Sequence, residues 1–218
     1  MTLKVNNLQC IRGGRELFSN LSFELQASQL MMLEGRNGSG KTTLLRALCG
    51  LYIPDEGEIL WQGERIQKQD EAYRCELLYL GHLNAIKADL NVLENLRFNT
   101  LIAGETVTDD ALMAALDTIG LYAFEEHLTR QLSQGQKRRV ALARLLLSKA
   151  RLWILDEPFV ALDVAAVTLL QTMIASHVEK GGMVILTTHQ EVPLTSGKIK
   201  RLSLNGNSLD GGREIGHA

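Results

Sequence analysis

The sequence predicts an α/β fold with a mixed sheet core, an antiparallel β subdomain and a helical insert. Three observations lead to this expectation. Short apolar runs bounded by glycine or polar residues recur along the chain, as is typical of strands. Helical periodicity dominates the middle of the chain, from about residue 91 to residue 148, and returns at residues 164–178. A glycine-rich segment at residues 35–43 separates an apolar run from a helical one.

The apolar runs define the expected strands, which are residues 21–25, 30–33, 59–61, 77–80, 152–155, 183–188 and 199–204. The runs that begin at residues 30, 152 and 183 favour central strands covered on both faces. The alternating run at 21–25 favours a half-exposed antiparallel strand. A helix is expected over residues 43–49, closed by Gly50. We therefore expect one domain over residues 1–204, with a core of about 1–82 and 151–204, a helical subdomain of about 83–150, and a loose tail at 205–218.

Composition narrows the classes of function. The 218 residues are 45% hydrophobic, which is enough to bury a full core. The net charge of −2 gives no global basic field to recruit nucleic acid. The three cysteines are scattered without a C-x-x-C pair, so neither a disulfide framework nor a zinc site is expected. No apolar stretch is long enough for a membrane span, so a membrane role would require a partner.

Residues 35–43 match the phosphate-binding pattern G-x-x-x-x-G-K-[ST], which makes the expected fold a P-loop NTPase. The glycines let backbone N–H groups turn inward around an anion, and Lys41 brings a mobile positive charge to the β- and γ-phosphates. Thr42 offers a hydroxyl to Mg²⁺, and the N-terminus of the following helix faces the phosphates. The predicted nucleotide-binding residues are Gly35, Arg36, Asn37, Gly38, Ser39, Gly40, Lys41, Thr42 and Thr43.

Two carboxylates follow the apolar run at 152–155. Asp156, at the carboxyl end of a buried strand, is suited to holding Mg²⁺ together with Thr42. Glu157 comes one residue later, where it can polarise a water for attack on the γ-phosphate. By itself the pair would be an acidic turn that caps a helix, but beside a phosphate-binding loop the catalytic interpretation is favoured.

Residues 132–136 read Leu-Ser-Gln-Gly-Gln and lead into an apolar-basic helix. Ser133 is a candidate N-cap, and Gly135 clears space at the first turn. This helix N-terminus is a second place suited to an anion. A plain capped helix would explain the serine. It would not explain why this pentapeptide is followed first by a helix and then by the strand that precedes Asp156 and Glu157.

That order resembles the ATP-binding cassette (ABC) family, and the resemblance extends from about residue 3 to residue 204. It implies ATP hydrolysis with Mg²⁺, Asp156 at the metal and Glu157 as the catalytic glutamate. His189 matches the switch histidine that contacts the γ-phosphate, and residues 161–163 match the loop that touches a partner cassette. Ser133, Gly135 and Gln136 match the signature motif, which in this family covers ATP bound to a second copy. A homodimer of cassettes in the ATP-bound state is therefore implied.

Two positions depart from the family pattern. Members usually carry an aromatic residue upstream of the phosphate loop, and here the candidate for stacking on the base is Arg12. A solvated arginine is the alternative, so adenine selectivity stays open. The second departure is His82, which follows the strand at 77–80 where the family normally has a water-positioning glutamine. We expect His82 to keep that role when neutral and to lose it when protonated; simple packing in the loop is the alternative.

Within the family, the stretches 81–96, 152–159, 181–190 and 199–204 resemble the bacterial subunits that serve haem export in cytochrome c biogenesis. This implies integral membrane partners at the cytoplasmic face of the bacterial inner membrane, docked near residues 86–96, with haem or a haem carrier involved indirectly. His127 and His177 are expected to be surface residues on helices rather than haem ligands.

Three other functions remain open at this stage. The chain could serve another ABC transporter. It could be a soluble cassette acting on nucleic acid or ribosomes, although its basic cluster at residues 137–144 is only local. It could bind ATP without hydrolysing it, although Glu157 argues against that.

Overall fold

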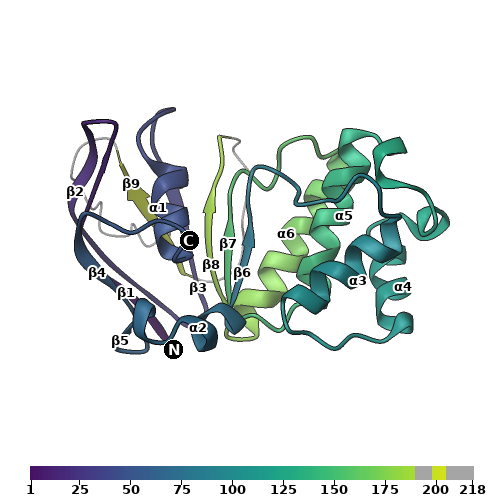
Figure 1. The fold of residues 1–218 in the computed structure, drawn as a ribbon, viewed down its shortest axis with the longest axis horizontal. Helices are drawn as coiled ribbons and strands as arrows, with labels where there is room; N and C mark the ends of the chain where they lie inside the picture. The colour runs from purple at the N-terminus through teal and green to yellow at the C-terminus, as the bar shows by residue number, and fades with distance from the viewer. Residues whose placement is uncertain (190–197, 205–218) are drawn as a thin grey trace, which may run out of the picture.

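The computed structural model describes residues 1–189 and 198–204, so the expected tail at 205–218 lies outside the described residues. Two sheets and a group of helices make up this part of the chain (Figure 1). The strands are β1 (Thr2–Arg12), β2 (Arg15–Gln26), β3 (Gln29–Glu34), β4 (Glu56–Trp61), β5 (Glu64–Arg65), β6 (Leu77–Leu80), β7 (Leu152–Leu155), β8 (Met183–Thr187) and β9 (Lys198–Ser203). The helices are α1 (Lys41–Leu48), α2 (Asp70–Cys75), α3 (Val92–Ile102), α4 (Asp109–Thr118), α5 (Gln134–Leu147) and α6 (Val164–Glu179).

The larger sheet has five parallel strands in the order β6-β7-β8-β3-β9. The strands β7, β8 and β3 are central, as their apolar runs predicted, and each is almost wholly buried. The predicted α/β fold is confirmed, with the parallel and antiparallel strands in separate sheets. Because the strands are parallel, their carboxyl ends meet at one edge of the sheet.

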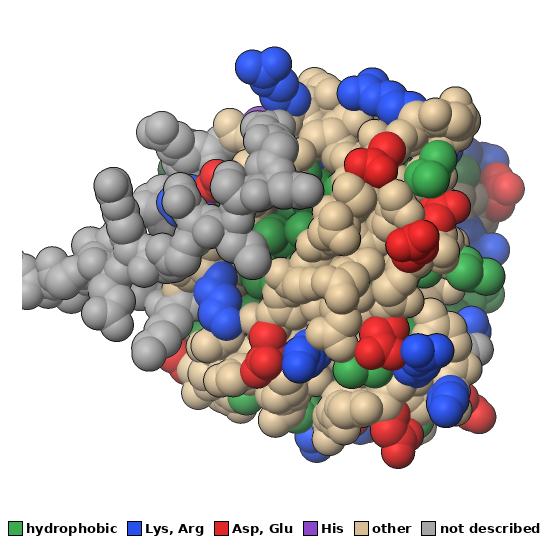
Figure 2. All heavy atoms as spheres, turned by 90° about the vertical axis from the view of Figure 1, so that its left-hand side faces the viewer, with side chains coloured by type: hydrophobic (Ala, Val, Ile, Leu, Met, Phe, Trp, Pro, Cys, Tyr) green, Lys and Arg blue, Asp and Glu red, His purple; other side chains and the backbone are tan. Residues whose placement is uncertain are grey.

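The smaller sheet is antiparallel, in the order β2-β1-β4-β5. It includes β2, whose alternating Leu21, Phe23 and Leu25 are buried as predicted. The sequence did not predict β1, because a register shift between Val5 and Leu8 breaks its alternation. Figure 2 shows this side of the molecule, where acidic and basic side chains are interspersed rather than gathered by sign.

The apolar residues form layers on both faces of the parallel sheet. On one face, Met31 and Leu33 pack with α1 and the antiparallel sheet. On the other, Leu30 and Met32 of the same strand pack with α5 and α6. In Figure 1, α1 accordingly lies between the two sheets, and α5 and α6 lie on the far side of the parallel sheet. At the end of α1, Gly50 closes the helix as expected, with φ +69° and its N–H bonded to the carbonyl of Ala47.

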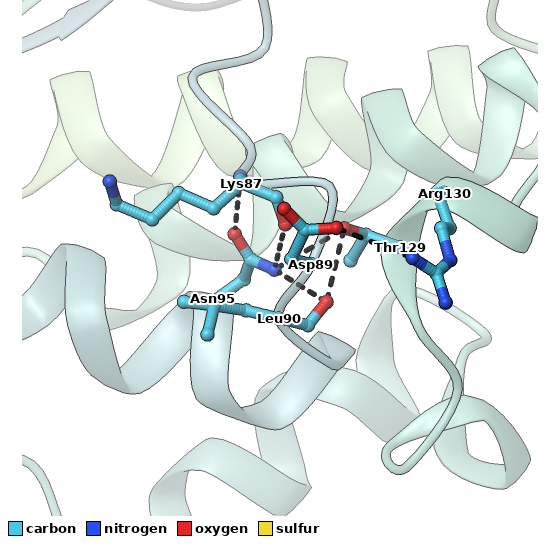
Figure 3. A network of polar contacts seen from close by, with 6 residues as sticks. All are labelled: Lys87, Asp89, Leu90, Asn95, Thr129 and Arg130. Atoms are coloured by element: carbon cyan, nitrogen blue, oxygen red, sulfur yellow. Dashed lines mark hydrogen bonds and ion pairs between the residues drawn. The ribbon is translucent and has the colours of Figure 1, made fainter.

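A third apolar cluster joins α3, α4 and one face of α5. The segment predicted as continuously helical is broken here into these three helices. Two short 3₁₀ turns, Tyr122–Phe124 and Thr129–Gln131, lie between α4 and α5. Figure 3 shows how the loop that enters α3 is held: the side chain of Asn95, fully buried, donates to the carbonyls of Lys87 and Leu90 and accepts from the N–H of Lys87. The hydroxyl of Thr129 also donates to the Lys87 carbonyl.

The expectation that His127 and His177 lie on helix surfaces was wrong in part. His127 lies in a bend between the 3₁₀ turns rather than on a helix, with its ring 5.0 Å from that of Phe124. His177 is on α6, but it is half-buried and its ring stacks on Trp153 at 3.8 Å. Among the described residues, no helix is long and apolar enough to cross a membrane.

Candidate active site

The carboxyl edge of the parallel sheet gathers the residues predicted to bind and cleave a nucleotide. The phosphate-binding loop follows β3, His82 follows β6, Asp156 and Glu157 follow β7, and His189 follows β8. A cavity of about 650 Å³ opens at this edge. Its lining includes Arg12, Arg36, Asn37, Gly38, Gly40, Lys41, Thr42, Thr43, His82, Asp156, Glu157 and His189. Segments from four strand ends thus form one pocket of a size suited to a small-molecule ligand.

Lys41 occupies the first turn of α1 and is nearly buried, at 9% exposure. Its Nζ donates to the carbonyl oxygens of Gly35, at 2.6 Å, and Arg36, at 3.2 Å. The N-cap of α1 is Gly40, which has no side chain to satisfy the first N–H groups of the helix. These N–H groups and the ammonium are suited to holding a phosphate chain.

Two glycines of the loop have no room for a side chain. A Cβ on Gly40 would lie 3.0 Å from the Cβ of Leu17 and 3.1 Å from the ring of Phe18, so only glycine fits there. A Cβ on Gly35 would lie 2.5 Å from the hydroxyl of Ser39, a buried oxygen for which no hydrogen-bond partner is found among the described residues. Gly35 and Ser39 therefore pack against each other within the loop and are not part of the cavity lining.

Asp156 is the buried carboxylate of the site, at 3% exposure. Its Oδ2 accepts from the Thr42 hydroxyl at 3.0 Å, and its Oδ1 accepts from the Thr187 hydroxyl at 2.9 Å. A carboxylate and a hydroxyl oxygen side by side, next to a phosphate-binding loop, are the oxygen donors that Mg²⁺ prefers. The residues present therefore fit a Mg²⁺–nucleotide complex.

Glu157 projects beside this pair. Its Oε1 lies 3.3 Å from Nε2 of His189, and no hydrogen bond to that buried oxygen is found in the described part of the chain. The contact with His189 places the carboxylate of Glu157 next to the imidazole. Both Glu157 and His189 line the cavity, so a base and an imidazole face the same space.

The two residues that depart from the family pattern also line the cavity. Arg12, at the end of β1, lies on its wall beside Leu17, where a planar base could stack on the guanidinium. His82 is exposed and lies on the wall with Glu157. Their expected roles remain predictions.

The signature residues lie apart from this cavity, at the N-terminus of α5. Ser133 is the N-cap, as predicted, and forms a capping box with Gln136. A Cβ on Gly135 would lie 3.3 Å from the carbonyl oxygen of Ala161, so this glycine lets the helix tip approach the loop at 161–163. Ser133, Gly135 and Gln136 are not part of the cavity lining, so within one chain they do not complete the pocket.

Sequence reasoning gave no role to two residues that contact the site. The hydroxyl of Thr187 accepts from the N–H of Glu157 at 2.8 Å, and the guanidinium of Arg138 donates to the Glu157 carbonyl at 2.8 Å. Arg138 carried a signal, since it falls in the apolar stripe of its helix, at i, i+3 and i+7 with Ala141 and Leu145. Nothing in the sequence singled out Thr187, because the group to which its hydroxyl bonds depends on which strand lies next to β8.

The sequence profile described as "ABC transporter" matches residues 18–160. The match covers most of the chain and includes the phosphate-binding loop, the signature residues, Asp156 and Glu157. The chain is an ABC transporter ATPase.

Solved structures of this family share its fold. One described as an ATP-binding subunit of an ABC transporter aligns with a TM-score of 0.78 and 26% identity, covering 87% of this ABC ATPase and 80% of that chain. A putative ABC transporter ATP-binding protein from Pyrococcus furiosus aligns with a TM-score of 0.80 and 25% identity, covering 95% and 100%.

Curated relatives are more similar in sequence. This ABC ATPase is 52% identical to the cytochrome c biogenesis ATP-binding export protein CcmA of Dechloromonas aromatica, over 93% of this chain and 99% of the relative. It is 52% identical to the CcmA protein of Nitrosomonas europaea and 50% identical to that of Vibrio cholerae, again over 93% of this chain.

Proposed function

We propose that this ABC ATPase is the ATP-hydrolysing subunit of a membrane complex for cytochrome c biogenesis, and that it energises haem export or the release of a haem-loaded carrier. The single observation that supports this most strongly is the 50–52% identity to CcmA proteins over 93% of the chain. Similarity of that extent spans both the catalytic edge and the helical insert. Haem itself would be handled by other subunits.

The site supports specific roles for this chain's residues. Lys41 and the N-terminus of α1 bind the phosphates, Thr42 and Asp156 hold Mg²⁺, and Arg12 stacks on the base. When bound, Mg²⁺ would neutralise charge on the phosphates. Glu157 takes a proton from the attacking water, His82 orients that water, and His189 donates to the γ-phosphate oxygen as charge develops.

Each chain supplies only part of this machinery. The Ser133 tip would seal the nucleotide held by a second copy, so hydrolysis takes place in a homodimer of cassettes. The catalytic core would be about residues 1–82 and 151–204, with a helical subdomain at about 83–150. We place the docking surface for integral membrane subunits near residues 86–96, where the buried Asn95 holds the loop in shape. The chain would then lie at the cytoplasmic face of the bacterial inner membrane.

Complementation tests this function. In a bacterium that lacks its own subunit of this type, the natural chain should restore haem-containing c-type cytochromes, measured by haem staining. Lys41→Ala should fail because it removes the phosphate contact, and Glu157→Gln should fail because it removes the base. Lys149→Ala, which removes an exposed ammonium that pairs with Glu105 away from the cavity, is the matched control and should restore them. If the Lys41→Ala and Glu157→Gln chains both restored the cytochromes, the proposal would be wrong.

A further inference from the structure

Arg138 is a buried arginine, at 4% exposure, that joins three segments far apart in the sequence. From α5, its Nη2 donates to the carbonyl of Glu157 at 2.8 Å and its Nε to that of Pro158 at 3.3 Å. Its Nη1 donates to the carbonyl of Gly81 at 3.3 Å and to Oδ1 of Asn84 at 3.0 Å. The guanidinium therefore ties the turn after β7 and the loop after β6 to the same helix.

Burial lowers the pKa of Arg138, while the charges of Asp156 and Glu157 oppose that shift. An arginine stays protonated throughout the physiological range despite such a shift. Burying a charged guanidinium costs free energy unless its donors are hydrogen-bonded, and Arg138 has four acceptors. All four acceptors lie on the two segments that carry Glu157 and His82.

The backbone of Glu157 needs support, because its φ is +50°, in the left-handed region that residues with a Cβ rarely adopt. Its N–H donates to the hydroxyl of Thr187 at 2.8 Å, and its carbonyl accepts from Arg138. Thr187 is fully buried, and its hydroxyl in turn donates to Oδ1 of Asp156 at 2.9 Å. The two peptide groups that flank Glu157 are thus each held by a buried side chain from another element.

We propose that Arg138 and Thr187 are positioning residues that clamp the backbone of Glu157 from both sides. Arg138 also holds the loop that carries His82 in a fixed position relative to Glu157. This rests on the role of Glu157 as the base in the proposed function. The clamp fixes where the Glu157 carboxylate stands over the cavity. Through Thr187, the same hydroxyl sets the orientation of Asp156, so the base and the metal-holding carboxylate are adjusted together.

Steady-state ATPase kinetics of the full chain test the clamp. Thr187→Val keeps the shape of the side chain but loses the hydroxyl, and Arg138→Met keeps an unbranched stem but loses every donor. Each should lower kcat by about 10²-fold, the cost of misplacing a catalytic group by an ångström. KM for ATP should stay unchanged in Arg138→Met, because Arg138 donates to backbone carbonyls and to Asn84 and not to the Asp156 carboxylate. Thr187→Ser should restore kcat, because it returns the hydroxyl.

Arg144→Met is the matched control. Arg144 lies on the same helix and burial lowers its pKa too, but it lines a separate pocket with residues of α3 and β6. This variant should keep the natural kcat and KM. A merely structural role for the clamp would instead lower the melting temperature of Thr187→Val and leave kcat of the folded protein intact.

The outcomes separate the clamp from the function on which it rests. If Thr187→Val and Arg138→Met fold and hydrolyse ATP at the natural rate while Glu157→Gln is inactive, the clamp is wrong and the proposed function stands. If Glu157→Gln itself keeps natural turnover, the assigned base is wrong. Should Arg138→Met fail to fold, Asn84→Ala, which removes one acceptor of the fork, takes its place and should also lower kcat; unchanged kcat there and in Thr187→Val would overturn the proposal.

Discussion

The ammonium group of Lys41 donates to carbonyl oxygens of its own loop. If Lys41 binds phosphate, as we propose, the ammonium would exchange these carbonyl partners for phosphate oxygens. A phosphate offers charged oxygens where Gly35 and Arg36 offer neutral ones, and charge-assisted hydrogen bonds are about twice as strong. The loop therefore keeps the lysine ordered before ATP arrives, which lowers the entropy lost on binding.

His82 provides a pH test at the scale of one residue. Neutral imidazole has an acceptor nitrogen for a water molecule, whereas the protonated ring has only donors. If His82 positions the water only in its neutral form, acid pH should lower the ATPase activity of the natural chain more than that of His82→Gln. Activity of the natural chain and of His82→Gln should be measured from pH 8 to pH 5. His189 is present in both proteins, so only the difference between the two profiles reports on His82, and identical profiles would show that His82 does not position the water.

Much of the nucleotide pocket could be predicted from the sequence, because its residues occur at fixed spacings that follow from the chemistry of phosphate binding. Lys41, Thr42, Asp156 and Glu157 belong to short motifs next to apolar runs. The support for Glu157 could not be predicted in the same way. Its partner Thr187 lies 30 residues further along the chain, on another strand. Only the pairing of β7 with β8 brings the two residues together.

At the scale of elements, the central strands were predictable because both of their faces are covered, by helices and by a second sheet. Almost every residue of such a strand is buried, so the strand appears in the sequence as a continuous apolar run. The strand β1 was not, because Asn7 adopts φ +47° and shifts the buried side from Val5 to Leu8. The breaks between α3, α4 and α5 were missed for a similar reason. The residues between these helices pack into the same apolar cluster, so the apolar pattern continues where the helix does not.

The packing of α6 against β7 depends on a histidine and should make stability depend on pH. The His177 ring stacks on Trp153, and a Cβ on Gly182 would lie 2.3 Å from its Nε2, so the ring is enclosed. Burial lowers the pKa of His177, with a smaller contribution from Lys180, although hydrogen bonds to the backbone of Arg151 and Met183 oppose the shift. The unfolded chain therefore binds this proton at a higher pH than the folded chain does.

It follows that the free energy of unfolding decreases as the pH falls from about 6.5, the ordinary value for histidine, toward the lowered pKa of the folded state. The melting temperature of the natural chain should fall over this range. His177→Phe keeps a ring on Trp153 but cannot be protonated, so its melting temperature should fall less between pH 7 and pH 5. Parallel curves for the two proteins would contradict this account of the α6–β7 contact.

At the scale of the whole molecule, the two anion-binding helix termini lie on different surfaces. The N-terminus of α1 faces the cavity, whereas the tip of α5 carries Ser133, Gly135 and Gln136 outside its lining. The residues of one chain that line the cavity include none from the tip of α5. In the proposed function, two chains would pair so that each α5 tip covers the nucleotide on its partner's phosphate-binding loop.

The mass of the Glu157→Gln chain in solution, determined by light scattering with ATP and with ADP, tests this pairing most directly. The variant binds ATP but should not hydrolyse it, so the pair should persist. We predict twice the 24.2 kDa of one chain with ATP, one chain with ADP, and one chain with ATP when Ser133→Arg blocks the tip. A mass of 24.2 kDa for an ATP-saturated Glu157→Gln chain would contradict the account.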